Sequence, residues 1–146
     1  MAILPTDEMK RFNYLSFEIN SAYHDAALKM GLSDSAMMIL YTVCNDGEEC
    51  LLRDIVRYSG ISKQTINSSL RKLEAENIVA LDSSDSRKKV VRLTEKGKES
   101  VKDSVLRLIK IENNILNSWS KRESEQYIEL TERYLAALKE KIEEDL

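Results

Sequence analysis

Three polar side chains, Gln64, Ser68 and Arg71, share one face of a segment whose apolar spacing is helical. Their amide, hydroxyl and guanidinium groups hydrogen-bond to base edges and to phosphate oxygens, and a helix that carries them fits the major groove of DNA. The flanking positions add groups of the same kind: Ser62, Lys63, Thr65, Asn67 and Lys72. Because acids are few until Glu74, the segment is a candidate nucleic-acid-binding helix.

A second group of candidate residues lies in the polar run DSSDSRKK, at positions 82–89. The run stands between two short apolar segments, 78–81 and 90–93, which read as the strands of a β-hairpin. It is too polar for a core and too basic at its end for an ordinary turn. The side chains at its tip that could contact DNA are Asp85, Ser86, Arg87, Lys88 and Lys89. Minor-groove edges and phosphates are the accessible targets for such a tip.

The elements before the hairpin set the orientation of the candidate helix. A short helix is expected from about Leu52 to Tyr58, and Gly60 supplies the backbone freedom of a tight turn between two helices. Ser62 is a good N-cap for the second helix. The core-facing side of that helix is formed by Ile66, Leu70 and Leu73. The sequence therefore predicts a mainly α protein with a small β-hairpin wing, a winged helix-turn-helix.

The hairpin and the residues after it resemble one family closely. The D-x-R…L-T-x-x-G wing signature of MarR-type bacterial transcription regulators is matched here by Asp85, Arg87, Leu93, Thr94 and Gly97. Further similarities are a helix that opens with Leu-Ser at positions 32–33 and a recognition helix of the form S-x-Q-T…L-x-x-L-E. The resemblance covers nearly the whole chain in length and element order.

This resemblance implies a homodimer that binds a pseudo-palindromic operator on double-stranded DNA and regulates transcription, by repression in our interpretation. By similarity, Arg87 would enter the minor groove and Asp85 would steady an arginine at the wing tip. Relatives release DNA when a small molecule, often an anionic aromatic, enters a cleft between the dimerisation helices and the DNA-binding lobe. The candidate residues for such an effector pocket are Tyr23, His24, Met37 and Tyr41, which would equally suit an ordinary core.

The charge is unevenly distributed along the chain. Its net value is −3, which by itself argues against a polyanionic partner. Residues 53–98, however, hold 11 Lys or Arg and 6 Asp or Glu, a net charge of +5, whereas the rest holds 11 and 19, a net charge of −8. A basic module in an acidic frame is typical of a nucleic-acid-binding surface, although charge alone would fit a merely solvated basic face equally well.

The segments on either side of the module read as dimerisation arms. We expect an N-terminal helix in residues 1–31, the winged helix-turn-helix in residues 32–97 and C-terminal helices in residues 98–146. One long helix is expected after Thr94, and Ser120 with Glu123 fits the S-x-x-E capping box that starts another. The apolar stripes of these helices exceed what a compact winged helix can cover, so pairing with a second copy is favoured over folding back within one subunit.

Length and composition limit the remaining possibilities. A chain of 146 residues with 42% hydrophobic and 32% charged residues suits one helix-rich domain with an oligomerisation arm. No apolar run approaches the ~18 residues of a membrane span, and the N-terminus lacks the pattern of a signal peptide. We therefore expect a cytoplasmic protein without a membrane partner. No cofactor is expected.

The sequence leaves two alternative functions open. The first is a redox-responsive regulator that uses Cys44 and Cys50, although the acids before Cys50 should disfavour its thiolate. The second is a winged-helix module that binds an acidic protein instead of DNA. Neither a metal site nor an enzyme is expected, because His24 is the only histidine and no phosphate loop, nucleophile elbow or convincing catalytic set is present.

Overall fold

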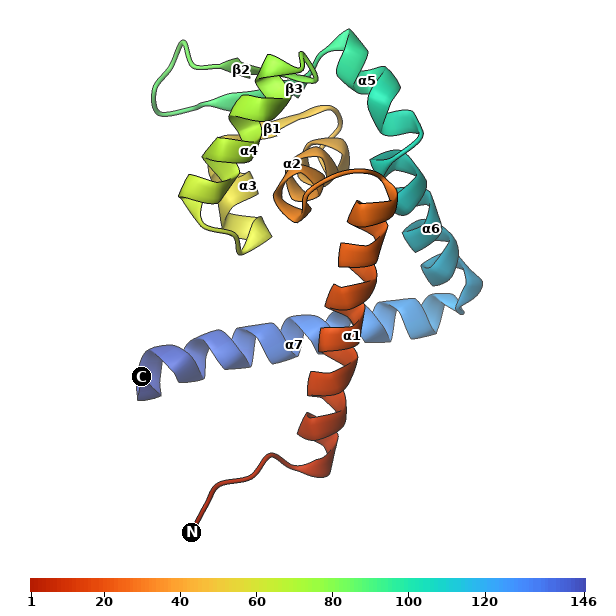
Figure 1. Ribbon diagram of the computed structural model, residues 1–146. Helices are drawn as coiled ribbons and strands as arrows, with labels where there is room; N and C mark the ends of the chain where they lie inside the picture. The colour runs from red at the N-terminus through yellow and green to blue at the C-terminus, as the bar shows by residue number, and fades with distance from the viewer. The chain divides into compact units, whose positions relative to one another are not determined.

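The computed structural model describes residues 1–146 and contains seven helices and a three-stranded sheet (Figure 1). The chain forms two compact units, residues 1–108 and 109–146. The elements of the first unit are α1 (Asp7–Lys29), α2 (Asp34–Asn45), β1 (Glu49–Leu51), α3 (Leu52–Ser59), α4 (Lys63–Ala75), β2 (Val79–Asp82), β3 (Val90–Leu93), α5 (Glu95–Lys102) and the start of α6 (Val105–Ser118). None of the helices has the length and apolarity needed to span a bilayer. The expected mainly helical winged helix-turn-helix is confirmed.

The sheet contains one strand more than the predicted hairpin. Its order is β1-β3-β2, with both pairs antiparallel, so β3 lies in the centre. Val91 of β3 faces Cys50 on one side and Leu81 on the other, and it is fully buried. The three-residue β1 is too short for an alternating pattern to reveal it, and pairing with β3 creates it. The predicted strand at 78–81 is shifted by one residue, to Val79–Asp82.

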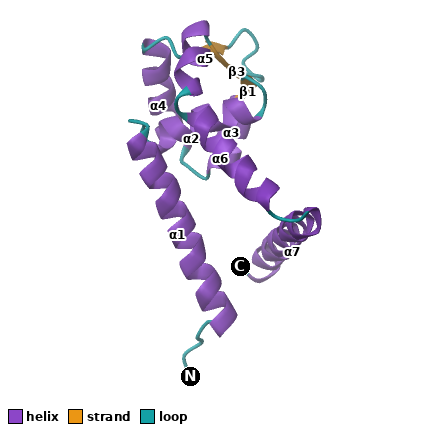
Figure 2. Cartoon of the chain, turned by 90° about the vertical axis from the view of Figure 1, so that its right-hand side faces the viewer, coloured by secondary structure: helices purple, strands orange, loops and turns teal.

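The winged helix-turn-helix, residues 32–97, is called the lobe below. Its core holds the inner face of α4. The helix α2 packs against α3 and α4, and the cartoon in Figure 2 shows it at the centre of this group. Ile39 of α2, Ile55 of α3 and Ile66 of α4 are fully buried there. Leu70 and Leu73 are buried beside them, as the helical spacing predicted. With this side of α4 held in the core, its polar side must face solvent.

The turn between α3 and α4 follows the predicted chemistry. Gly60 adopts a left-handed conformation, with φ of +67°, which a residue with a Cβ rarely adopts. Ser62 is the N-cap of α4, and its hydroxyl accepts a hydrogen bond from the backbone N–H of Thr65 at 3.2 Å. The two helices of the motif therefore meet at a sharp, well-capped corner.

Thr94 and Gly97 of the L-T-x-x-G signature attach α5 to the base of the wing. Thr94 is the N-cap of α5; its hydroxyl accepts a hydrogen bond from the N–H of Gly97 and donates to the carbonyl of Asn77 at 2.6 Å. Gly97 approaches the strand so closely that an added Cβ would lie 2.0 Å from the carbonyl oxygen of Ile78. Only glycine fits at this contact, which ties α5 to the start of β2.

The prediction of one long helix after Thr94 is wrong. The chain forms α5, breaks at Asp103 and Ser104, and continues as α6. The hydroxyl of Ser104 bonds to the carbonyl of Ser100 at 3.0 Å, and that of Ser100 bonds to the carbonyl of Gly97. Such local side-chain bonds compete with helix continuation. No proline or glycine marks the break, so the apolar periodicity ran through it undetected.

The second unit consists of the end of α6 and the helix α7 (Lys121–Asp145). The predicted start of α7 is confirmed, because Ser120 and Glu123 form a complete capping box. The N–H of Glu123 donates to the hydroxyl of Ser120 at 3.1 Å, and the N–H of Ser120 donates to the carboxylate of Glu123 at 2.9 Å. The ring of Trp119 lies edge-to-face against Tyr127, with 5.5 Å between centroids. α7 has 25 residues and none of them is buried.

Candidate nucleic-acid interface

The outer face of α4 carries a hollow that gathers most of the residues singled out on this helix. Its volume is about 510 Å³. The residues that line it are Lys63, Gln64, Asn67, Ser68 and Arg71. All of them are exposed except the half-buried Asn67. The helix thus presents amide, hydroxyl and cationic groups together on the side opposite its buried isoleucine and leucines.

Three of the predicted residues of α4 lie outside this hollow. The hydroxyls of Ser62 and Thr65 are engaged with each other at 2.9 Å in the N-cap, so their first role is to start the helix. Lys72 is exposed near the C-terminal end of α4. Because they do not line the hollow, these three residues are less suited to contact bases than Gln64 and Arg71.

The wing tip is shaped by its own aspartates. The carboxylate of Asp85 accepts a hydrogen bond from the backbone N–H of Arg87 at 2.9 Å, and the carboxylate of Asp82 accepts one from the N–H of Ser84 at 3.0 Å. The bond to Ser84 is the main reason why the pKa of Asp82 is lowered, and Arg92, 4.0 Å away, adds to it. Asp85 thus steadies the main chain at Arg87 and leaves its guanidinium available.

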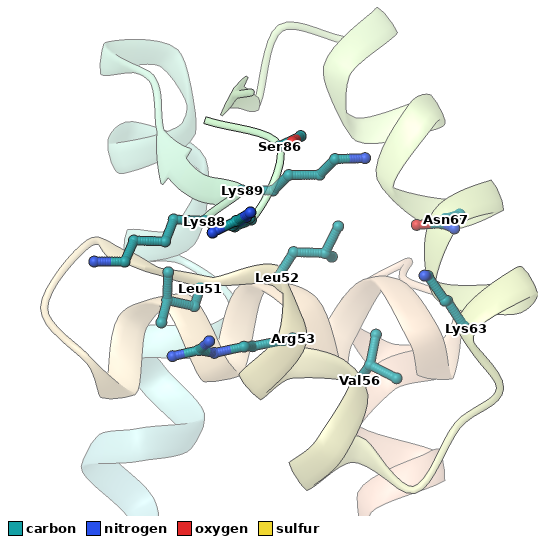
Figure 3. Close-up of a pocket in the computed structure, with 10 residues that line it drawn as sticks. Leu51, Leu52, Arg53, Val56, Lys63, Asn67, Ser86, Lys88 and Lys89 are labelled. Carbon is teal, nitrogen blue, oxygen red and sulfur yellow. The ribbon is translucent and has the colours of Figure 1, made fainter. Parts of the chain in front are cut away.

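A second hollow, of about 320 Å³, joins the wing to α4 (Figure 3). The predicted residues that it brings together are Lys63, Asn67, Ser86, Arg87, Lys88 and Lys89. It shares Lys63 and Asn67 with the hollow on α4, so the two are adjacent. Residues predicted separately, on a helix and in a loop, therefore form one continuous surface.

The cations of this surface are not neutralised within the chain. Lys98 lies 3.3 Å from Glu48 and 3.0 Å from Glu95, and Lys102 lies 2.8 Å from Glu99. Hydrogen bonds to these glutamates raise the pKa of both lysines. In contrast, Lys63, Arg71 and the cations of the wing tip take part in none of the ion pairs. Their positive charge remains available to an external anion.

A comparison with protein families and the wing signature both indicate similarity to the MarR family. Residues 30–89, which run from α2 through the helix-turn-helix to the tip of the wing, match the sequence model of the MarR family. This part of the chain is therefore similar in sequence to the MarR family. No curated protein matches the sequence.

Solved structures extend the likeness from residues 30–89 to the rest of the chain. A MarR family regulator from Neisseria meningitidis is 15% identical and has a TM-score of 0.83, with 97% of this chain and 100% of that chain covered. MepR of S. aureus in complex with DNA is 21% identical, with a TM-score of 0.62 and coverage of 92% and 99%. PcaV from Streptomyces coelicolor, in complex with its natural ligand, is 17% identical, with a TM-score of 0.61 and coverage of 93% and 99%. At these identities the likeness establishes the fold.

The four residues suggested for a MarR-type effector pocket lie on α1 and α2. Met37 is buried in the core, Tyr23 and Tyr41 are half-buried, and His24 is more than half exposed. The Nδ1 atom of His24 lies 2.8 Å from the carboxylate of Asp34, the first residue of α2. This contact, above all its hydrogen bond, raises the pKa of His24. His24 therefore connects α1 to α2, and its part in an effector pocket stays a prediction.

The two cysteines are placed unfavourably for redox chemistry. Burial is the main cause that raises the pKa of the Cys44 thiol to about 11 and that of the Cys50 thiol to about 12. The acids that add to this effect at Cys50 are Asp46 and Asp54, not the preceding glutamates that the sequence suggested. Both thiols are therefore protonated near neutral pH, and since the thiolate is the reactive form, this disfavours the redox alternative.

Proposed function

We propose that this chain is a sequence-specific DNA-binding transcription regulator that acts in the cytoplasm as a homodimer and represses transcription from a pseudo-palindromic operator. The observation that carries the proposal is the continuous surface formed by α4 and the wing. It combines side chains that read base edges, Gln64 and Arg71 among them, with unneutralised cations. A surface for an acidic protein would need the cations but not the amides and hydroxyls beside them.

The surface favours one way of docking on DNA. The polar side of α4 enters the major groove, where Gln64 and Arg71 hydrogen-bond to base edges. The wing reaches the adjacent minor groove, where Arg87 is drawn to a narrow, A·T-rich segment. Lys88 and Lys89 contact phosphates, which fix the position of the protein without reading the sequence. The solved complex of MepR with DNA supports a DNA-binding role for this fold.

A homodimer is proposed because the terminal helices carry apolar side chains at the surface. In α1, Leu15 and Ile19 are 56% and 51% exposed, and in α7, Leu130 and Leu138 are 56% and 41% exposed. Exposed apolar side chains along a helix favour an interaction surface, and most soluble oligomers are symmetric homodimers or assemblies of them. Two copies related by a two-fold axis would place two α4 helices in successive major grooves.

Release of DNA by a small aromatic or anionic effector completes the proposal. Its support is the solved complex of PcaV, a structural relative, with its natural ligand. Tyr23, His24, Met37 and Tyr41 are the residues that we would substitute first to find such a site. An effector bound there must lower DNA affinity by the same factor as DNA lowers effector affinity.

The test of DNA recognition compares substitutions on α4 with substitutions in the wing. An operator is first selected with the wild-type protein from random duplexes. Affinities for the operator and for a scrambled duplex are then measured over a salt series. Gln64→Ala and Arg71→Ala should each lose about 1–3 kcal/mol per half-site against the operator only. Lys88→Ala and Lys89→Ala should weaken both duplexes and lower the salt slope by roughly one per site.

A matched control is Lys102→Ala, which removes a lysine that is already paired with Glu99. It should change neither affinity nor salt slope. If the α4 variants lose affinity equally for both duplexes, Gln64 and Arg71 do not read bases. If the wild-type protein selects no sequence at all, the protein-interaction module becomes the better explanation of the basic surface.

The test of the dimer is truncation of residues 120–146, which removes α7. The intact protein should sediment as a dimer at micromolar concentration. The truncated protein should dissociate and lose affinity for the operator together, because each copy then binds a half-site alone. A soluble monomer of the intact chain at that concentration would overturn the dimer.

A further inference from the structure

The hollow between α4 and the wing is also lined by a third element, the start of α3. Arg53 and Leu52 come from this helix, and neither was among the residues predicted to contact DNA. Lys63, Arg53, Lys88 and Lys89 all line the hollow. In Figure 3, Lys89 extends from the wing toward α4, whereas Lys88 and Arg53 extend together toward the side away from α4. Arg53 is thus the one cation of the hollow that comes from neither of the two proposed reading elements.

The charge of the hollow is of one sign. Five cations line it, namely Arg53, Lys63, Arg87, Lys88 and Lys89, and no carboxylate does. None of the five forms an ion pair within the chain. Leu52, which is 93% buried, closes the hollow toward the core. An arrangement of uncompensated cations around a concave site is suited to an anion with several acceptor oxygens.

The geometry of double-stranded DNA indicates which anion this is. With α4 in the major groove and the wing in the adjacent minor groove, one sugar-phosphate strand separates the two elements. That strand must pass between α4 and the wing, where the hollow lies. We infer that the hollow seats a backbone phosphodiester of the operator, and that Arg53 is a third DNA-contacting element alongside α4 and the wing. The inference rests on the proposed function.

The role of Arg53 follows from its chemistry and its place. A guanidinium presents a planar fork of donors that matches two phosphate oxygens, which a lysine cannot do. Arg53 is held by the first turn of α3, and the next buried residue of that helix, Ile55, is packed in the core. The site of Arg53 is therefore rigid relative to α4, so it would fix the register of the lobe on the backbone and not read bases.

The experiment pairs substitutions of Arg53 with chemical neutralisation of single phosphates. The duplex is the operator selected with the wild-type protein, with one phosphate at a time replaced by an uncharged methylphosphonate. Dissociation constants are measured for the wild type, Arg53→Gln, Arg53→Lys and Arg107→Gln. Arg107→Gln is the matched control, because it removes the same charge from an exposed position on α6 that does not line the hollow. Thermal unfolding verifies that all variants fold.

We expect Arg53→Gln to weaken operator and scrambled duplex by the same factor and to lower the salt slope by about one per protomer. Arg53→Lys should keep the slope and recover only part of the affinity. Arg107→Gln should behave as the wild type. At one phosphate per half-site, between the major groove and the flanking minor groove, the methylphosphonate should weaken the wild type more than it weakens Arg53→Gln, because only the wild type loses the contact with Arg53.

Two results would overturn the inference alone. One is an Arg53→Gln protein that binds as Arg107→Gln does. The other is an Arg53→Gln protein that loses as much affinity as the wild type at every methylphosphonate position. In both cases the Gln64 and Arg71 variants would still discriminate operator from scrambled duplex, so the proposed function would stand. If the wild type selected no duplex, both the inference about Arg53 and the proposed function would be wrong.

Discussion

The winged-helix lobe and the helix α7 place their apolar side chains in opposite ways. Each element of the lobe contributes residues to a shared core, and Ile55 of α3 and Ile66 of α4 are 0% exposed. In α7, by contrast, none of the 25 residues is buried, and Leu130 and Leu138 remain about half exposed. The two regions have similar helical periodicity and yet bury very different amounts of surface.

This difference indicates that the lobe is stabilised by packing within one chain, whereas α7 needs a surface from outside its own chain. The lobe buries its apolar surface within one chain, so its stability should not depend on protein concentration. A helix without a buried residue in its own chain is only marginally stable unless another surface covers it. The stability of α7 should therefore be coupled to association with a second copy and should rise with concentration.

The largest effect is expected in the core of the lobe. Ile66→Ala removes a fully buried side chain from the inner face of α4, which should cost about 2–5 kcal/mol of unfolding free energy. Urea unfolding followed by circular dichroism measures this loss, and it should be the same at low and high protein concentration. The matched substitution is Leu138→Ala in α7, which should mainly raise the dissociation constant of the dimer. If both variants showed the same dependence on protein concentration, the lobe and α7 would not differ in how they are stabilised.

A smaller loss is expected where the wing meets α5. Gly97→Ala places a Cβ against the carbonyl oxygen of Ile78, and the backbone must shift to relieve the contact. Overpacking of this kind typically costs about 1–3 kcal/mol. Calorimetry should record a lower melting temperature for this variant, whereas Glu99→Ala, on the exposed side of the same helix, should change stability little. Unchanged stability of Gly97→Ala would mean that α5 does not pack tightly against the backbone at Ile78.

The cap of α7 sharpens the comparison further. Ser120→Ala removes one of the two hydrogen bonds of the capping box, at a cost of about 1 kcal/mol. Because α7 is coupled to association, the loss should appear as weaker dimerisation in sedimentation experiments. Lys121→Ala, which alters only a side chain with 90% exposure, is the control. A loss that is independent of concentration would place the stability of α7 within one chain.

The smallest effect concerns the contact between α1 and α2. Since Asp34 raises the pKa of His24 above 6.5, folding strengthens proton binding, and the stabilisation is fully present below that value. It should disappear as the pH rises through the raised pKa. The wild type should therefore exceed His24→Gln in urea midpoint at about pH 5 and match it at about pH 9. A difference that persists unchanged at the higher pH would mean that the contact does not depend on the proton.

Local signals of the sequence predicted most of the lobe. Gly60, Ser62 and the apolar spacing of α4 define the helix-turn-helix because each acts through its own backbone or the next turn of helix. The capping box at Ser120 is equally local. The break at Ser104 escaped prediction because side-chain bonds to the preceding turn leave the apolar periodicity unchanged.

The sequence by itself determined which side chains are suited to contact DNA: the polar face of α4 and the basic tip of the wing. Only the tertiary structure brought them together as neighbouring walls of one hollow and added Arg53 from α3. It also revealed β1, whose three residues form a strand by pairing with β3. The reason is that such contacts join residues far apart in the chain, and folding of the whole core, not local spacing, sets the distance between them.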